Sequence, residues 1–297
     1  MYEPLVYGHA SDTRGVACHP TQHAQFATAC ESGHVCLWTG DRRQLIAKCR
    51  LGGGVAARCL AFDPAGAVLA VGCGDGGLVI VRVDCGSAPP LSEQLCRQRN
   101  AAEAVSAVRF SPDGRRLVTG SHDNGIDIYG CSEGYPLLRR CQGHSSYITH
   151  LDWSADSTLF QSNCGAYEAL VWDAKTGRQA RGNARDVRWA EWTCALGFPV
   201  MGVFPDNANG TDVDSVCRSF VAADAARAAA PAAHDPLASS AGRYVVTGDD
   251  SGNVRLYAYP CVVDAAPCRT YTAHCSHVKG VRFSYDNRCA SPPCLTF

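Results

Sequence analysis

The chain has 297 residues, of which 46% are hydrophobic and 19% are charged, and its formal net charge is −1. This composition excludes a largely disordered protein, and the near-neutral charge excludes a general attraction to nucleic acid or to anionic membranes. No apolar run approaches the roughly 18–20 residues that cross a bilayer, and the first residues show no signal-peptide pattern. We therefore expect no nucleic-acid partner, no membrane partner and a location in the cytoplasm.

The predicted elements repeat along the chain. Each repeat contains an apolar strand, a turn with Pro or Asp, a second apolar strand, a turn with Gly or Asp, and a third strand of alternating polarity. This order is clearest in four segments: residues 15–38, 55–81, 105–129 and 148–172. Repeats of about 40–45 residues with four short strands each are typical of WD-type β-propeller blades.

Two short sequence elements support this assignment. A Gly-His or Ala-His pair precedes three of the repeats, and its histidines are His9, His144 and His274. We interpret these histidines as buried hydrogen-bonding residues and not as metal ligands or catalytic bases. Aromatic residues are expected to close four of the third strands: Trp38, Tyr129, Trp172 and Tyr257.

The last two repeats depart from the pattern. The fifth is expected to begin at residues 189–192 and to reach its closing strands at residues 244–257, after an Ala-rich insertion near residues 222–242. Ala, Pro and Ser offer little apolar surface to bury, which predicts a poorly ordered insertion. The sixth repeat begins regularly, but Pro292 and Pro293 exclude the strand expected there.

These patterns predict an all-β fold, a WD-repeat β-propeller with about five complete blades and a partial sixth, because an apolar four-stranded sheet must pack against neighbours around a ring. The propeller is expected over residues 1–290 and an irregular tail over residues 291–297. The incomplete sixth repeat leaves open whether these residues alone close the ring. It also indicates part of a longer protein or an altered C-terminal end.

The 18 cysteines are interpreted as small buried hydrophobic residues. No CxxC pair occurs, and typical cysteines lie inside apolar runs: Cys18, Cys30 and Cys59. The spacing of the C-terminal cysteines is not that of a zinc finger. A metal or redox role is the alternative left open.

Three patterns that imitate catalytic or binding motifs are better explained by structure. Residues 72–77 satisfy GxGxxG, but a β-branched strand follows in place of the helix that a dinucleotide site needs. Residues 121–123 read Ser-His-Asp, and adjacent residues cannot converge as a triad. The loop around Asn209 and Gly210 resembles a calcium loop, but Pro205 stands at the first ligand position. We therefore predict no enzyme activity, no metal and no cofactor.

The later repeats resemble the C-terminal WD-repeat propeller of the echinoderm microtubule-associated protein-like family. Five stretches carry the resemblance: residues 143–157, 162–177, 193–219, 247–261 and 273–284. The most specific part is GFPVMGVFPDNANGTDVD at residues 197–214. The resemblance implies microtubule association and a role in cytoskeletal organisation through paired propellers. This sequence does not include the family's preceding propeller with its HELP motif, its coiled coil or its basic region.

In a propeller blade, the loop between the first and second strands and the loop between the third and fourth strands lie on the same face of the disc. Basic residues occupy such loops in three repeats, and we call them the basic face: Arg42, Arg43, Arg115, Arg116, Lys175 and Arg178. The basic face is the predicted partner-binding surface, because it could meet the acidic tails of tubulin by charge complementarity. The alternative is that these side chains are simply solvated turn residues.

The predicted function is that of a non-enzymatic, microtubule-associated WD-repeat protein. Its expected partners are tubulin, microtubules or microtubule-bound proteins, and its expected location is the microtubule cytoskeleton of the cytoplasm or of a cilium. The alternative is a general WD-repeat scaffold for a multiprotein complex without direct tubulin contact.

Overall fold

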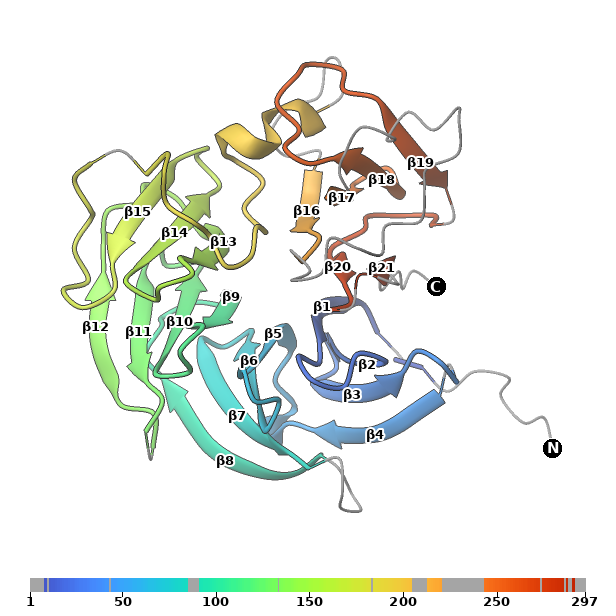
Figure 1. Cartoon of the computed structure of the whole chain (residues 1–297). Coiled ribbons are helices and arrows are strands. Elements are labelled where there is room, and N and C mark those ends of the chain that lie inside the picture. The colour runs from blue at the N-terminus through green and yellow to red at the C-terminus, as the bar shows by residue number, and fades with distance from the viewer. Residues whose placement is uncertain are drawn as a thin grey trace.

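The structure, a computed structural model of the chain, arranges antiparallel β-sheets as blades around a central axis (Figure 1). In the part of the chain that it describes, the only helices are two short 3₁₀ segments, η1 (Gly52–Gly54) and η2 (Phe198–Val203). The structure describes these residues: 8, 9, 11–42, 44–84, 91–132, 134–182, 184–204, 213–220, 243–272, 274–285, 287, 290 and 291. The Ala-rich insertion predicted near residues 222–242 therefore lies outside the described residues.

Blades 1, 2 and 3 are four-stranded sheets in which each strand pairs with the next along the chain. Blade 1 contains β1 (Thr13–Cys18), β2 (Gln25–Cys30), β3 (His34–Thr39) and β4 (Gln44–Arg50). Blade 2 contains β5 (Ala57–Phe62), β6 (Val68–Cys73), β7 (Gly77–Val83) and β8 (Leu91–Arg99). Blade 3 contains β9 (Val105–Phe110), β10 (Arg116–Ser121), β11 (Ile126–Gly130) and β12 (Leu137–Cys141).

The remaining blades differ in completeness. Blade 4 contains β13 (Ile148–Trp153), β14 (Leu159–Cys164) and β15 (Ala169–Asp173), and an isolated bridge from Trp172 to Gln179 stands where a fourth strand would run. Blade 5 contains β16 (Val213–Arg218), β17 (Tyr244–Asp249), β18 (Asn253–Ala258) and β19 (Cys268–Thr272). Among the described residues, blade 6 contains β20 (Arg282–Phe283) and β21 (Ala290–Ser291). The predicted propeller with a partial sixth blade is confirmed, except that blade 4 has three strands.

The aromatic residues predicted to close third strands do so. Trp38 lies in β3, Tyr129 in β11, Trp172 in β15 and Tyr257 in β18. The Trp172 side chain is only 1% exposed, and Trp153 at the end of β13 is 3% exposed. The repeat register derived from the sequence is therefore correct for the blades that carry these residues.

The fifth blade begins later than the sequence indicated, and the prediction of a first strand at residues 189–192 is wrong. The first strand is β16, and Trp189 forms only an isolated bridge to Ser154 just after β13. The rings of Trp189 and Trp192 pack edge to face, with centroids 6.4 Å apart, and both residues are buried. This apolar run is therefore buried by side-chain packing between blades 4 and 5, not by strand pairing.

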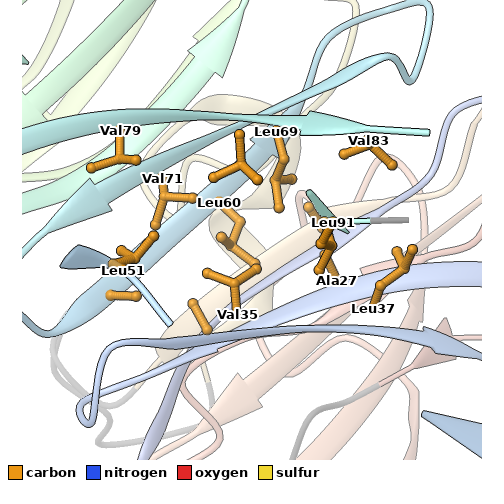
Figure 2. Close-up of a cluster of buried hydrophobic side chains, with 14 of the residues drawn as sticks. Ala27, Val35, Leu37, Leu51, Leu60, Leu69, Val71, Val79, Val83 and Leu91 are labelled. Carbon is orange, nitrogen blue, oxygen red and sulfur yellow. The ribbon is translucent and has the colours of Figure 1, made fainter. Parts of the chain in front are cut away.

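Hydrophobic side chains pack successive blades against each other. Figure 2 shows one such cluster, in which Val35 and Leu37 of β3 meet Leu69 and Val71 of β6. Strands such as β6 are buried along nearly their whole length because both faces of each sheet are covered. This two-sided burial explains why the strands read as continuous apolar runs.

The innermost strands of all six blades surround a central channel. Contacts run from β1 to β5, β5 to β9, β9 to β13, and from β16 through β20 back to β1. Two cavities of about 290 and 570 Å³ occupy this channel and are lined by residues of all six strands. The ring, whose closure the sequence left open, is closed through the short blade 6.

The cysteines behave largely as the sequence indicated. Those described are free thiols, and most are buried, including Cys30 and Cys59, whereas Cys18 is half-buried. Burial raises the pKa of the Cys59 thiol to about 12, so that the thiolate is disfavoured at neutral pH. Both helices in the described part of the chain are far too short to span a bilayer.

Candidate partner-binding surface

The turn between β9 and β10 positions Arg115 and Arg116. Ser111 Oγ donates to Asp113 Oδ1 over 2.6 Å, and the backbone N–H groups of Arg115 and Arg116 donate to Asp113 Oδ1 and Ser111 Oγ over 3.0 and 2.9 Å. Gly114 completes the turn with φ of 68°, in the left-handed region that glycine tolerates. The side chain of Arg115 is exposed, and that of Arg116 is half-buried.

The loop after β15 positions Lys175 and Arg178 in a similar way. Asp173 Oδ1 accepts hydrogen bonds from the backbone N–H of Lys175 over 3.1 Å and from the N–H and hydroxyl of Thr176, both over 2.7 Å. These bonds from Thr176 and Lys175, together with the nearby charge of Arg116, lower the pKa of Asp173. Lys175 and Arg178 themselves are exposed.

The loop between β13 and β14 contacts both of these loops, and the N–H of Ala174, just after β15, donates to the carbonyl of Thr158 in it over 2.9 Å. The backbone N–H of Asp113 in blade 3 donates to Ser157 Oγ in blade 4 over 3.1 Å. The start of β14 pairs with the end of β15 through Leu159 and Asp173, which places both blade 4 loops at one edge of the sheet. The structure thus brings four residues of the basic face together on adjacent blades: Arg115, Arg116, Lys175 and Arg178.

The other two residues of the basic face lie apart from these four. Arg42 is exposed in the loop between β3 and β4 of blade 1, with blade 2 between it and blade 3. Arg43 lies outside the described residues. Among the residues that the structure describes, Arg42, Arg115, Lys175 and Arg178 form no ion pair with an acidic side chain.

The histidines of the Gly-His pairs form hydrogen-bond networks inside blades 1 and 4. In blade 4, Trp172 Nε1 donates to Ser162 Oγ over 2.7 Å, and that hydroxyl lies 2.6 Å from His144 Nε2. In blade 1, Thr28 Oγ1 lies 2.6 Å from His9 Nε2 and accepts the indole N–H of Trp38 over 2.7 Å. These contacts hold three segments of a blade together, which is the structural role that the sequence predicted.

Three residues of the blade 4 network are close enough together to resemble a metal-binding group. One ligand atom each of His144, Cys164 and Glu168 lies within 4.8 Å of the others. Glu168 accepts hydrogen bonds from the backbone N–H of Ser145 over 2.9 Å, from its hydroxyl over 2.8 Å, and from the Cys164 thiol over 3.2 Å. These bonds lower the pKa of Glu168 to about 2 and already use its oxygens, so the group serves the blade structure.

The three sequence patterns that resemble catalytic or binding motifs lie as follows in the structure. Ser121 Oγ donates to a backbone carbonyl, Asp123 pairs with Arg140 over 2.6 Å, and the ring of His122 lies 5.0 Å from that of Tyr147. Residues 72–77 span the end of β6, the turn and the start of β7, and no helix follows them. Most of the calcium-like loop, residues 205–212, lies outside the described residues.

The loop that joins blade 4 to blade 5 was not predicted from the sequence. Buried Asp152 of β13 accepts bonds from the N–H of Thr193 over 2.8 Å, from its hydroxyl over 2.8 Å, and from the N–H of Cys194 over 2.9 Å. The loop leaves a groove between the two blades that includes several arginines. The sequence signal for it was an acidic residue between Leu151 and Trp153 in a predicted strand, because a buried carboxylate needs hydrogen-bond donors.

Comparison with known proteins gives consistent matches. Residues 14–290 match the family model described as the echinoderm microtubule-associated protein second beta-propeller. The chain is 38% identical to echinoderm microtubule-associated protein-like 3 of Mus musculus, over 96% of this chain and 29% of that protein. It is 38% identical to echinoderm microtubule-associated protein-like 2 of Rattus norvegicus, over 95% of this chain and 40% of that protein. It is 36% identical to the 77 kDa echinoderm microtubule-associated protein of Lytechinus variegatus, over 96% of this chain and 40% of that protein. The chain thus spans well under half the length of these relatives.

Proposed function

The chain belongs to the echinoderm microtubule-associated protein family, and from this premise we propose that it is a non-enzymatic protein that binds microtubules through its basic face. The relatives are named as microtubule-associated proteins, which supports a cytoskeletal role for this propeller. The proposed partner is tubulin or a protein already bound to the microtubule, and the proposed location is the microtubule cytoskeleton.

The observation that carries the proposal is the grouping of exposed cations on adjacent blades. Arg115, Lys175 and Arg178 are exposed. The carboxylates of their loops and of the β13–β14 loop accept hydrogen bonds from their own turns: Asp113, Asp173 and Asp156. A cluster of solvated cations attracts an acidic protein segment and accelerates its encounter. Such a surface is suited to the acidic tails of tubulin.

Co-sedimentation with purified microtubules tests the proposal. The variant carries Arg115→Glu, Lys175→Glu and Arg178→Glu, which replace exposed side chains and leave the backbone hydrogen bonds of the turns available. We expect this variant to remain in the supernatant under conditions in which the parent protein pellets. The matched control carries Arg50→Glu and Arg99→Glu at the ends of β4 and β8, on the opposite face, and should pellet like the parent. Equal pelleting of both variants would remove the basic face as the binding surface.

A scaffold function without direct tubulin contact is the second candidate. It is favoured by one observation: the chain covers only 29–40% of the length of the relatives named above, so other parts of those proteins are available for microtubule contact. If the parent chain stays in the supernatant at every microtubule concentration, the scaffold function is the one to retain.

A further inference from the structure

A groove with a volume of about 1170 Å³ opens between blades 4 and 5. One wall is formed by β14 and β15, and the other by the loops that follow β16 and β18. Figure 1 shows these two blades set apart, with the segment that contains η2 crossing between them. None of the basic-face residues lines this groove, so a ligand of the groove would not need the surface proposed to bind microtubules.

The groove and its rim expose aromatic and apolar surface. Phe198, which lines it, is 70% exposed and Tyr259 is half-buried, whereas Trp192 also lines it but is only 4% exposed. Met201, three residues after Phe198 in η2, is 47% exposed. Large apolar side chains that gather on the surface of a folded domain mark an interaction site, because burying them in a complex is favourable.

The charge of the groove has one sign. Four arginines line the groove: Arg185, Arg188, Arg218 and Arg243. Among the residues that the structure describes, no aspartate or glutamate lines it. Arg218 is held in place by the carbonyls of Trp189 and Ala190, over 3.1 and 2.9 Å, and lies over the ring of Tyr259 at 5.4 Å. Arg188 and Arg243 are exposed, and their backbone carbonyls accept bonds from Ala155 and Tyr259. A ligand that complements this groove is acidic.

A strand whose outer edge is only partly paired lines the groove as well. Three consecutive residues of β15 line it, namely Ala169, Leu170 and Val171. The outer edge of β15 is paired from Val171 to Asp173, where the N–H of Ala180 donates to the carbonyl of Val171 over 2.7 Å and the N–H of Asp173 donates to the carbonyl of Arg178 over 2.9 Å. At the start of β15, the backbone of Ala169 pairs with Asn163 of β14 but has no described hydrogen-bond partner on the outer edge. An unpaired edge is the feature by which an extended peptide adds a strand to a sheet.

We propose that this groove docks an extended acidic peptide that carries a bulky apolar side chain. Its backbone pairs with the edge of β15, its carboxylates meet Arg188 and Arg243, and its apolar side chain packs on Phe198 and the aromatic wall. The strand edge distinguishes this ligand from a nucleic acid, which could use the arginines and aromatic rings but not the backbone groups of β15.

Fluorescence anisotropy with the full chain tests the proposal. The probe is a labelled, glutamate-rich peptide with one central phenylalanine. We expect Arg188→Glu with Arg243→Glu to weaken its binding about tenfold or more, because two attractive charges become repulsive. Phe198→Ser should weaken this peptide but leave unchanged the weaker binding of a matched peptide with serine in place of phenylalanine. Methylation of alternate backbone nitrogens of the peptide should abolish binding in one register and spare it in the other.

The matched control carries Arg42→Glu with Arg115→Glu on the basic face, and it should bind the peptide like the parent. This control distinguishes the two proposals, because it can lose microtubule binding while it still binds the peptide. Unchanged affinity in the Arg188→Glu, Arg243→Glu variant would overturn the groove proposal. So would equal binding of a single-stranded oligonucleotide with the same dependence on these arginines. Binding that arises only after deletion of residues 222–241, which connect Phe220 to Arg243, would overturn it too, because the chain itself would then occupy the groove.

Discussion

The indole nitrogen of Trp172 donates a hydrogen bond to the hydroxyl of Ser162 over 2.7 Å, joining the third strand of blade 4 to the second. The same relationship recurs in blade 1 between Trp38 and Thr28, also over 2.7 Å. In both blades a histidine from the segment before the first strand reaches the same hydroxyl. Each blade is therefore fastened by a polar contact inside an otherwise apolar sheet.

Replacing Trp172 by alanine is expected to cost roughly 3–5 kcal/mol in the free energy of unfolding, the usual range for emptying an aromatic core site. The side chain is 1% exposed and stacks near Phe160 at 6.4 Å, so its removal leaves a cavity and takes away one of the two hydrogen-bond partners of the Ser162 hydroxyl. Urea unfolding followed by circular dichroism measures the change. The control is Phe198→Ala, which removes an aromatic ring that is 70% exposed and should change stability by less than about 0.5 kcal/mol.

His9 is expected to make stability depend on pH. Burial, reinforced by the charge of Lys48, lowers the pKa of His9 from 6.5 to about 4 in the folded protein. The unfolded chain therefore takes up a proton first as pH falls, and the stability that neutral His9 provides, complete above pH 6.5, is lost progressively down to about pH 4. The His9→Gln variant should lose less stability than the parent between pH 7 and pH 4.5. Parallel pH profiles for the two proteins would contradict this prediction.

Asp152 is expected to be needed for the loop between blades 4 and 5. Asp152→Ala leaves the buried N–H groups of Thr193 and Cys194 without an acceptor and should cost on the order of 3 kcal/mol. Hydrogen exchange should show that these two amides lose protection while the amides of blade 2 retain theirs. Asp156→Ala removes an exposed carboxylate from the same blade and serves as the control, with an expected cost of about 1 kcal/mol. An equal effect of both substitutions would show that the loop does not depend on Asp152.

Microtubule binding by the basic face is expected to weaken as salt rises, because the Debye length shrinks from about 10 Å at 0.1 M to about 3 Å at 1 M. Enzymatic removal of the acidic tubulin tails should reproduce the effect of the charge reversals at low salt. Co-sedimentation across a salt series measures both. Binding that is indifferent to salt and to tail removal would indicate an apolar contact elsewhere on the propeller.

Local chemistry explains what the sequence predicted correctly. The turn at Ser111 and Asp113 and the position of Trp172 could be predicted, because each depends on contacts with residues of the same repeat. The first strand of the fifth blade was misplaced because Trp189 and Trp192 form an apolar run that resembles a strand, while its burial depends on packing between two blades. The groove could not be predicted for the same reason, since its walls come from segments distant in sequence.

The short sixth blade has a mechanical consequence. β20 and β21 are paired through two residue pairs, Arg282 with Ser291 and Phe283 with Ala290, whereas β1 and β2 are paired through five. Among the described strands, β20 also provides the link between β16 and β1. Tension applied between β1 and β21 would therefore act directly on this short junction. The disc is expected to open there first, into an arc of five blades that each keep their own hydrogen bonds.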